Sequence, residues 1–273
     1  MTGKTGDRQQ VVPTTTATQA RIRLYQPTKK PVTRAGEWIA TPWGRCRVVG
    51  RLGQRHADLV DALAYCSEKR RDLADIGSIE VLVDMARVRK VISSTYSHEQ
   101  LWKLIQECMT ALVEIEVPGV DYPALGHLID SVEPSAMTRR DPLGGERHLW
   151  RVRFGRAMSK FIESDPIKMY HDPAPIARLR HGISQAVARH ILTHKSTPNG
   201  GWHVDTALRA VLGDQEKDGS TSMSMRDGRR RLKEDAEALK AAGILLADDR
   251  IHKGSVAQPP DSVAQPPDFS AFR

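Results

Sequence analysis

Two stretches of this chain show the same order of predicted elements, and that repetition limits the available folds more than any other feature. Each stretch indicates a helix, a strand, a short helix, a turn, a long helix and a β-hairpin. The first lies within residues 36–165 and the second within residues 166–254. We therefore expect an α+β chain, mainly helical, with two domains of one design in tandem and small antiparallel β-hairpins.

The second stretch has the clearer helical periodicity. A helix near 174–195 carries one apolar face, made of Ile176, Leu179, Ile183, Val187 and Ile191. The segment "DTALRAVLG" predicts a short helix with Asp205 as its N-cap and Gly213 as its C-cap. A long helix then ends near Gly243, and "ILLAD" and "RIHKG" predict the hairpin.

The first stretch repeats this order at greater length. A helix near 55–70 is followed by the strand "SIEVLVD" and the short helix "MARVRKVIS". Ser97 and Gln100 form a capping box for the next helix. Its predicted buried stripe consists of Leu101, Leu104, Ile105, Cys108 and Leu112. "HLIDSV" and "HLWRVRF" indicate strands, and "GRAMSKFIES" predicts a closing helix.

Helix, strand, helix, helix, hairpin is the order of a winged helix. In that arrangement the second helix of the helix-turn-helix lies in the DNA major groove and the hairpin forms the wing. The formal net charge of +8 and the pI near 9.5 also favour a polyanionic partner. We therefore expect each stretch to be a winged-helix domain.

The second long helix begins with a basic cluster that we expect to contact double-stranded DNA. Cations at a helix N-terminus oppose the helix dipole, and phosphate would relieve that conflict. The alternative is a solvated face with pairs such as Arg230–Glu234 and Lys233–Glu237. The candidate DNA contacts of this domain, including two in the wing, are Arg226, Arg229, Arg230, Arg231, Lys233, Arg250 and Lys253.

The first domain has a less charged recognition helix, with Lys103 and Gln106 as candidate contacts beside Glu99 and Thr110. Its other cations suit phosphate contacts, which position a protein without reading sequence. They lie in the preceding helix and in a loop, and are Arg87, Arg89, Lys90, Arg139 and Arg140. This domain would hold the DNA backbone or mediate self-association, while the second reads bases.

The composition of both ends of the chain predicts disorder. Residues 1–35 are low in complexity, basic and broken by proline, and 255–273 contain "SVAQPPD" twice in tandem. Gly3–Thr5 matches only the end of a phosphate-binding loop, without the upstream glycine and strand. The role of the long loop over 118–145 stays open.

Nothing in the sequence favours an enzyme, a cofactor, a metal or a membrane. Three widely spaced cysteines argue against a disulfide framework and fit a reducing cytoplasm. His190 and His194 have the i, i+4 spacing of a metal pair but lack a third ligand, so we interpret them as helix-surface histidines. Trp102 and Trp150 are expected in the core. No run of 18 apolar residues occurs.

The chain resembles the replication initiators of iteron-bearing bacterial plasmids over roughly residues 44–254. The resemblance rests on the element order, on "LWKLIQECMTALVEIEV" followed by "HLWRVRF", and on "MRDGRRRLKEDAEALKAAGILL", which is similar to the recognition helix and wing of the TrfA and RepC types. It implies binding to direct repeats at a plasmid origin, opening of an AT-rich segment and recruitment of host replication proteins such as a helicase or initiator. It also implies a homodimer formed through the first domain and autoregulation.

Two other functions remain open at this stage. A winged-helix transcriptional repressor would need the same basic helix but only a palindromic operator. An architectural scaffold would use its winged helices to bind protein, and its DNA binding would depend weakly on salt.

Overall fold

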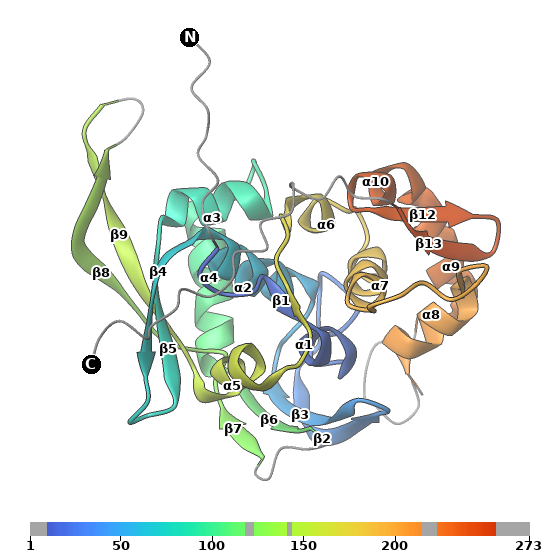
Figure 1. The fold of residues 1–273 in the computed structure, drawn as a ribbon, viewed down its shortest axis with the longest axis horizontal. Helices are drawn as coiled ribbons and strands as arrows, with labels where there is room; N and C mark the ends of the chain where they lie inside the picture. The colour runs from blue at the N-terminus through green and yellow to red at the C-terminus, as the bar shows by residue number, and fades with distance from the viewer. Residues whose placement is uncertain (1–9, 118–122, 141–143, 214–222, 255–273) are drawn as a thin grey trace, which may run out of the picture.

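The structure is a computed structural model that describes residues 10–117, 123–140, 144–213 and 223–254. It is an α+β fold with several small antiparallel sheets (Figure 1). Helices make up 39% and strands 32%, so the sheets are larger than a mainly helical chain would have. Within those ranges, no helix is long and apolar enough to cross a bilayer.

Residues 36–165, called block one below, centre on two four-stranded sheets. The first has the order β2-β3-β6-β7 and comprises β2 (Arg34–Thr41), β3 (Gly44–Gly50), β6 (Leu112–Glu116) and β7 (Ala124–Gly126). The second has the order β4-β5-β9-β8 and comprises β4 (Ser67–Leu73), β5 (Ser78–Val83), β8 (Ile129–Arg140) and β9 (Glu146–Phe154). The helices of block one are α2 (Gln54–Cys66), α3 (Met85–Ile92), α4 (His98–Thr110) and α5 (Arg156–Ser164).

Residues 166–254, called block two, are more compact in design. Their helices are α6 (Ala174–Ala177), α7 (Gly182–Leu192), α8 (Val204–Leu212), α9 (Met225–Glu234) and α10 (Ala236–Ala241). A three-stranded sheet of order β11-β13-β12 comprises β11 (Trp202–His203), β12 (Ile244–Ala247) and β13 (Arg250–Lys253). Gly213 ends α8 with a φ of 67°, which confirms the predicted C-cap.

Both blocks contain the predicted elements, but block one has additional strands between them. In block one, α2 is followed by β4, β5, α3, α4, β6, β7 and the β8–β9 hairpin, and one sheet has the order β4-β5-β9-β8. In block two, α7 is followed by β11, α8, α9, α10 and the β12–β13 hairpin, and the strands pair as β11-β13-β12. Each hairpin therefore docks its second strand on the early strand of its own block.

Each block buries a separate apolar core along the faces that the sequence predicts. In block one the predicted core positions are fully or almost fully buried at Leu59, Leu63, Cys66, Leu101, Leu104, Ile105 and Cys108. In block two the same holds for Ile176, Leu179, Ile183, Val187 and Ile191. Leu112 is the exception, because the helix ends at Thr110 and Leu112 begins β6 with 38% of its surface exposed.

The N-terminal segment is packed, so the prediction of a disordered tail over 1–35 is wrong from residue 10 onward. Val12, Ile22 and Leu24 are fully buried. β1 (Thr15–Thr16) pairs with β10 (Lys168–Met169), and α1 (Ala17–Arg21) follows directly. Composition misled here because the partners of this polar segment lie far away in sequence. We call residues 10–33 the N-terminal strap.

Two predicted helices are interrupted, and the two breaks meet at Asp235. The helix expected over 174–195 stops after α6 and restarts at α7, and the long helix before Gly243 is divided between α9 and α10 at Asp235. The buried Asp235 carboxylate accepts the backbone N–H groups of Arg180 and His181, at 3.0 and 2.9 Å. These two hydrogen bonds hold the start of α7 against the break between α9 and α10.

Three predictions fall wholly or partly outside the described residues. Gly3–Thr5 and the repeat tail 255–273 lie entirely outside them. The long loop predicted over 118–145 is described in part. Its described residues include two strands, β7 and β8, where the sequence predicted a loop.

Candidate nucleic-acid interface

Helix α9 is held on the body by a narrow apolar face, and this leaves its cations outside. Ser224 caps its start by accepting the backbone N–H of Asp227 at 3.1 Å. Gly228 and Leu232 are buried, and a Cβ at position 228 would lie 3.0 Å from Leu208 of α8. A larger side chain would therefore push α9 away from α8.

Two of the α9 arginines are already engaged by carboxylates. Arg229 forms a two-pronged ion pair with Asp205 of α8, with Nε 2.6 Å from Oδ1, and this pairing lowers the pKa of Asp205. The N-cap of α8 is His203, so the prediction of Asp205 as the N-cap is wrong. Asp205 lies in the first turn of α8. Arg230 pairs with Glu234 one turn on, as the solvated alternative predicts.

Three other cations of this helix keep their charge available to an outside anion. Within the described part of the chain, no carboxylate lies within ion-pair distance of Arg226, Arg231 or Lys233. Arg226 and Lys233 are exposed, and Arg231 is half-buried. The basic surface of α9 is therefore partly neutralised by its own protein and partly open.

The β12–β13 hairpin contributes less positive charge than the sequence suggests. Lys253 donates its Nζ to the carbonyls of Leu192, at 2.9 Å, and His194, so it caps the end of α7. Partial burial there lowers the pKa of Lys253. The turn holds Asp248 and Asp249, the latter 3.9 Å from Arg250. Of the two predicted wing contacts, only Arg250 remains a candidate.

In block one, α4 presents Lys103 and Gln106 to solvent as predicted. Its start has the predicted capping box, because Ser97 accepts from the Gln100 backbone at 3.1 Å and Gln100 accepts from Ser97 at 2.9 Å. Trp102 and Trp150 pack edge to face 5.2 Å apart against the core, so neither is a platform for stacking bases.

The phosphate-binding candidates of block one are spread over α3 and the long β8 strand. Arg139 and Arg140 lie at the end of β8 and not in a loop. The Glu68 carboxylate forms ion pairs with Arg139, at 2.7 Å, and with Arg87 of α3, at 3.8 Å. Arg89, Lys90 and Arg140 have no such carboxylate among the described residues. Arg140, at the far end of a protruding hairpin, is the best placed of the five to reach a partner (Figure 1).

Sequence reasoning missed a set of cations on the outer face of the β4-β5-β9-β8 sheet. Arg151 and Arg153 of β9 alternate with inward Val152 and Phe154, and β4 adds Lys69 and Arg71 at neighbouring register positions. The period-two spacing in "HLWRVRF" was the available signal. Glu133, 3.1 Å from Arg151, and Glu80, 4.0 Å from Arg153, offset part of this charge.

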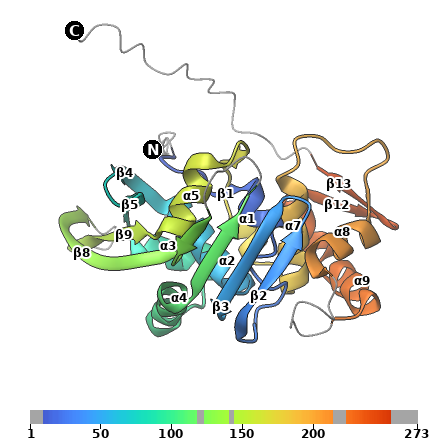
Figure 2. The same ribbon diagram turned by 90° about the horizontal axis from the view of Figure 1, so that it is seen from below.

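Helices α4 and α9 lie along the same edge of the molecule. Seen from below, both helices are at the lower edge of the ribbon, one in each block, with the ends of β2 and β3 between them (Figure 2). Lys103 and Gln106 are exposed on α4, and Arg226 and Lys233 are exposed on α9. The Lys253 ammonium is instead occupied by backbone carbonyls at the end of α7.

The histidine pair is packed inside the protein. His190 is buried and its Nε2 lies 3.3 Å from Nε2 of His194, which follows the end of α7. Trp43 and Trp202 flank the pair with ring centroids at 5.2 Å from His190 and 5.4 Å from His194. Burial lowers the pKa of His190 to about 3 and that of His194 to about 4. The interpretation as helix-surface histidines is therefore wrong for His190, which is buried, whereas His194 is half-exposed and lies just beyond α7. Across the described ranges, no three metal-ligating side chains come together.

Comparison of the chain with protein-family models, with curated proteins and with solved structures finds no match. The geometry and charge of the two blocks are therefore the basis for proposing a function.

Proposed function

We propose that the chain is a non-enzymatic, sequence-specific DNA-binding protein that binds direct repeats at a plasmid origin and initiates replication there. In this proposal each block is a winged helix, with α4 and α9 as the recognition helices. The observation that carries it is that in each block a strand precedes two consecutive helices and pairs with the second strand of a later hairpin, with α4 and α9 along one edge (Figure 2).

The strand pairing supports the winged-helix proposal in both blocks. The orders β5-β9-β8 and β11-β13-β12 place a hairpin beside the strand that precedes the two consecutive helices. Such a hairpin stands next to the recognition helix, where a wing contacts the adjacent groove or phosphates. Two such units facing one side would bind one duplex over two major-groove segments.

The distribution of charge supports a division of work between the blocks. Arg226, Arg231 and Lys233 lie on the helix that would enter the groove, and Arg and Lys reading guanine edges are the commonest specific contacts. Block one offers Lys103 and Gln106 on α4, with Arg140 on the hairpin. We assign base reading chiefly to α9 and backbone contacts chiefly to block one.

The experiment is a selection of duplexes from a random library with the full chain, followed by footprinting. The proposed function predicts an enriched sequence long enough to present two major-groove segments on one face, about 10 base pairs apart. Two such sites in direct orientation beside an AT-rich segment, opened on binding, would support an initiator. An inverted repeat with no opening would support a repressor instead, and recovery of no sequence would contradict DNA reading altogether.

A further inference from the structure

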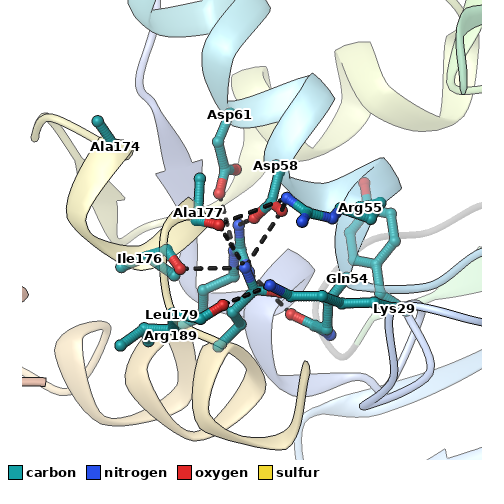
Figure 3. Close-up of polar contacts among 12 residues, drawn as sticks. Lys29, Gln54, Arg55, Asp58, Asp61, Ala174, Ile176, Ala177, Leu179 and Arg189 are labelled. Atoms are coloured by element: carbon teal, nitrogen blue, oxygen red, sulfur yellow. Dashed lines mark hydrogen bonds and ion pairs between the residues drawn. The ribbon is translucent and has the colours of Figure 1, made fainter. Parts of the chain in front are cut away.

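A buried ionic network joins the two blocks at Arg189 of α7. Its Nη2 lies 2.7 Å from Oδ1 of Asp58, its Nε 2.8 Å from Oδ2 of Asp61, and its Nη1 donates to Oε1 of Gln54 at 2.8 Å (Figure 3). Asp58 and Asp61 are one turn apart on α2 and have no exposed surface, and Arg189 is 4% exposed. Every nitrogen of the guanidinium thus bonds to block one.

Further hydrogen bonds surround this centre. Gln185 of α7 donates across to Oδ2 of Asp58 in block one at 3.2 Å, and to the Ile176 and Ala177 carbonyls of its own block at 3.1 and 3.0 Å. Lys29 of the N-terminal strap donates to the Leu179 carbonyl (Figure 3). The strap, α2 and the α6–α7 segment therefore meet at a single polar point.

Stability alone is a poor explanation for this network. Removing two carboxylates and a guanidinium from water costs several kcal/mol for each ion, and apolar residues of similar size often serve stability as well or better. Oδ1 of Asp61 and Oε1 of Gln185 are buried, and no described residue bonds to them. What the network supplies that apolar packing does not is a fixed direction, because a guanidinium bonding two carboxylates allows one geometry.

The two helices that the network joins are the supports of the proposed recognition helices. In block one α2 packs against α4, and in block two α7 packs against α9. Fixing α7 on α2 therefore fixes α9 relative to α4. Two recognition helices can enter successive major-groove segments only if their separation matches the DNA helical repeat, about 34 Å per turn.

We propose that Arg189, with Asp58 and Asp61, is a positioning device that sets the spacing and angle between α4 and α9, and so allows one chain to bind both halves of its DNA site at once. This inference rests on the proposed function. Arg189 itself is buried and touches no DNA.

The decisive variant replaces the network by apolar residues: Arg189→Met with Asp58→Leu and Asp61→Leu. Gln185 still donates to the Ile176 and Ala177 carbonyls, and none of the three substituted positions carries a charge. Arg55 loses Asp58 but still donates to the Ala177 carbonyl at 3.5 Å, and Gln54 loses the donor to its Oε1. We expect its thermal midpoint to stay close to that of the wild type. Its affinity for the full selected duplex should fall by at least about tenfold, because the two blocks no longer engage together. Its affinity for the half that α9 binds should not change.

A second variant, Arg189→Lys, guards against failure of the first to fold. It keeps the charge but presents one compact ammonium, which cannot hold both carboxylates in the same geometry. We expect a smaller loss, about threefold on the full duplex, again with no change on the half-site. Arg70→Met is the matched control, because it removes an exposed arginine paired with Asp72 within block one and should leave the ratio of the two affinities unchanged.

A measurement without DNA reads the orientation directly. Exposed Ala74 in block one and Ala238 in block two accept cysteine-linked spin labels, since Cys46, Cys66 and Cys108 are buried. The distance distribution between the labels should be narrow in the wild type and broader or shifted in both network variants.

The outcomes separate the two proposals. Unchanged distances, or an unchanged ratio of full-site to half-site affinity, in a folded apolar variant would overturn the positioning role. If the wild type selects no duplex, the proposed function fails and the role in DNA binding fails with it, whereas the label distances still decide whether the network orients the blocks.

Discussion

Block one and block two share an element order but differ in where they place their charge and their extra structure. Block two has a hairpin of two four-residue strands with an acidic turn, and its cations gather on α9. Block one has strands of 12 and 9 residues in its hairpin, two four-stranded sheets, and an α4 with little net charge. Its open cations lie on α3 and at the end of β8.

Two blocks with related element orders can therefore present different side chains to a partner. The parts common to both blocks are those that form the apolar core and hold one helix at the surface. The parts that differ are the side chains on that helix and the length of the hairpin, which are the features that would choose between bases and phosphates. The comparison therefore predicts unequal effects from matched mutations.

The largest effect is expected from the open cations of α9. Arg226→Ala and Lys233→Ala should each cost about 1–3 kcal/mol on the selected duplex and much less on a scrambled one, because base contacts are lost. The matched variants in α4 are Lys103→Ala and Gln106→Ala, for which we expect smaller losses. Titrations of all four proteins on both duplexes measure this. Equal losses from the α4 pair would move sequence reading into block one.

We expect the free energy of unfolding to fall at acid pH, because two histidines of block two stay uncharged while the protein is folded. Burial lowers the pKa of His190 to about 3 and of His171 to about 4, so on unfolding these two histidines bind two protons between about pH 6.5 and 4. Burial raises the pKa of Asp61 to about 6, so unfolding releases one proton over part of that range. The net uptake of about one proton by these three groups lowers the free energy of unfolding by about 1.4 kcal/mol per pH unit as the pH falls from 6 to 4, and the half-exposed His194, with its pKa lowered to about 4, adds to the same trend.

Urea denaturation at several pH values measures this slope. Asp61→Asn removes the opposing group and should make the slope about twice as steep. A stability that rises as the pH falls through this range would contradict the burial of the two histidines.

A smaller effect separates two neighbouring arginines of β8. Arg140→Ala should weaken selected and scrambled duplexes alike and lower the slope of log affinity against log salt by about one. Arg139→Ala should change that slope less, because Glu68 already holds Arg139 at 2.7 Å. Salt titrations of both variants test the assignment, and a greater change for Arg139 would show that its ion pair opens on binding.

No measurable effect is expected from deleting 255–273, which lies outside the described residues. Its tandem proline-rich repeat has no apolar face to bury. The thermal midpoint and the affinity for the selected duplex should therefore both match those of the full chain. A midpoint lower by several degrees would show that the tail packs on one of the blocks.

Periodicity predicted the helices well wherever the contacts are local. The faces of α2, α4 and α7 and the capping box at Ser97 follow from residues within a few positions of each other. The breaks at Asp235 and before α7 do not follow from such local patterns. The two hydrogen bonds that join them, from Arg180 and His181 to Asp235, link residues 55 and 54 positions apart. β4 escaped notice because "SEKRRDL" is an exposed edge strand without apolar alternation.

The candidate interface was predictable in its helices but not in its pairing. The cluster on α9 is evident from the sequence, yet the engagement of Arg229 by Asp205 and of Lys253 by the α7 carbonyls depends on tertiary contacts. The Arg189 network shows the same limit. Its members are ordinary helix residues until the fold brings positions 58, 61 and 189 together.

The position of the N-terminal strap has a consequence for synthesis of the chain. Arg21 bonds to Thr193, 172 residues later, with Nε 3.2 Å from the hydroxyl oxygen, and Thr15 pairs with Met169. At translation rates of about 5–20 residues per second, the strap leaves the ribosome on the order of 10–30 seconds before those partners exist. Block one can bury Ile22 and Leu24 of the strap in its own core during that interval. The bonds from the strap to β10 and to Thr193 form only afterwards, so a ribosome that stalls between these points would carry a chain in which one side of the strap is docked and the other still waits for block two.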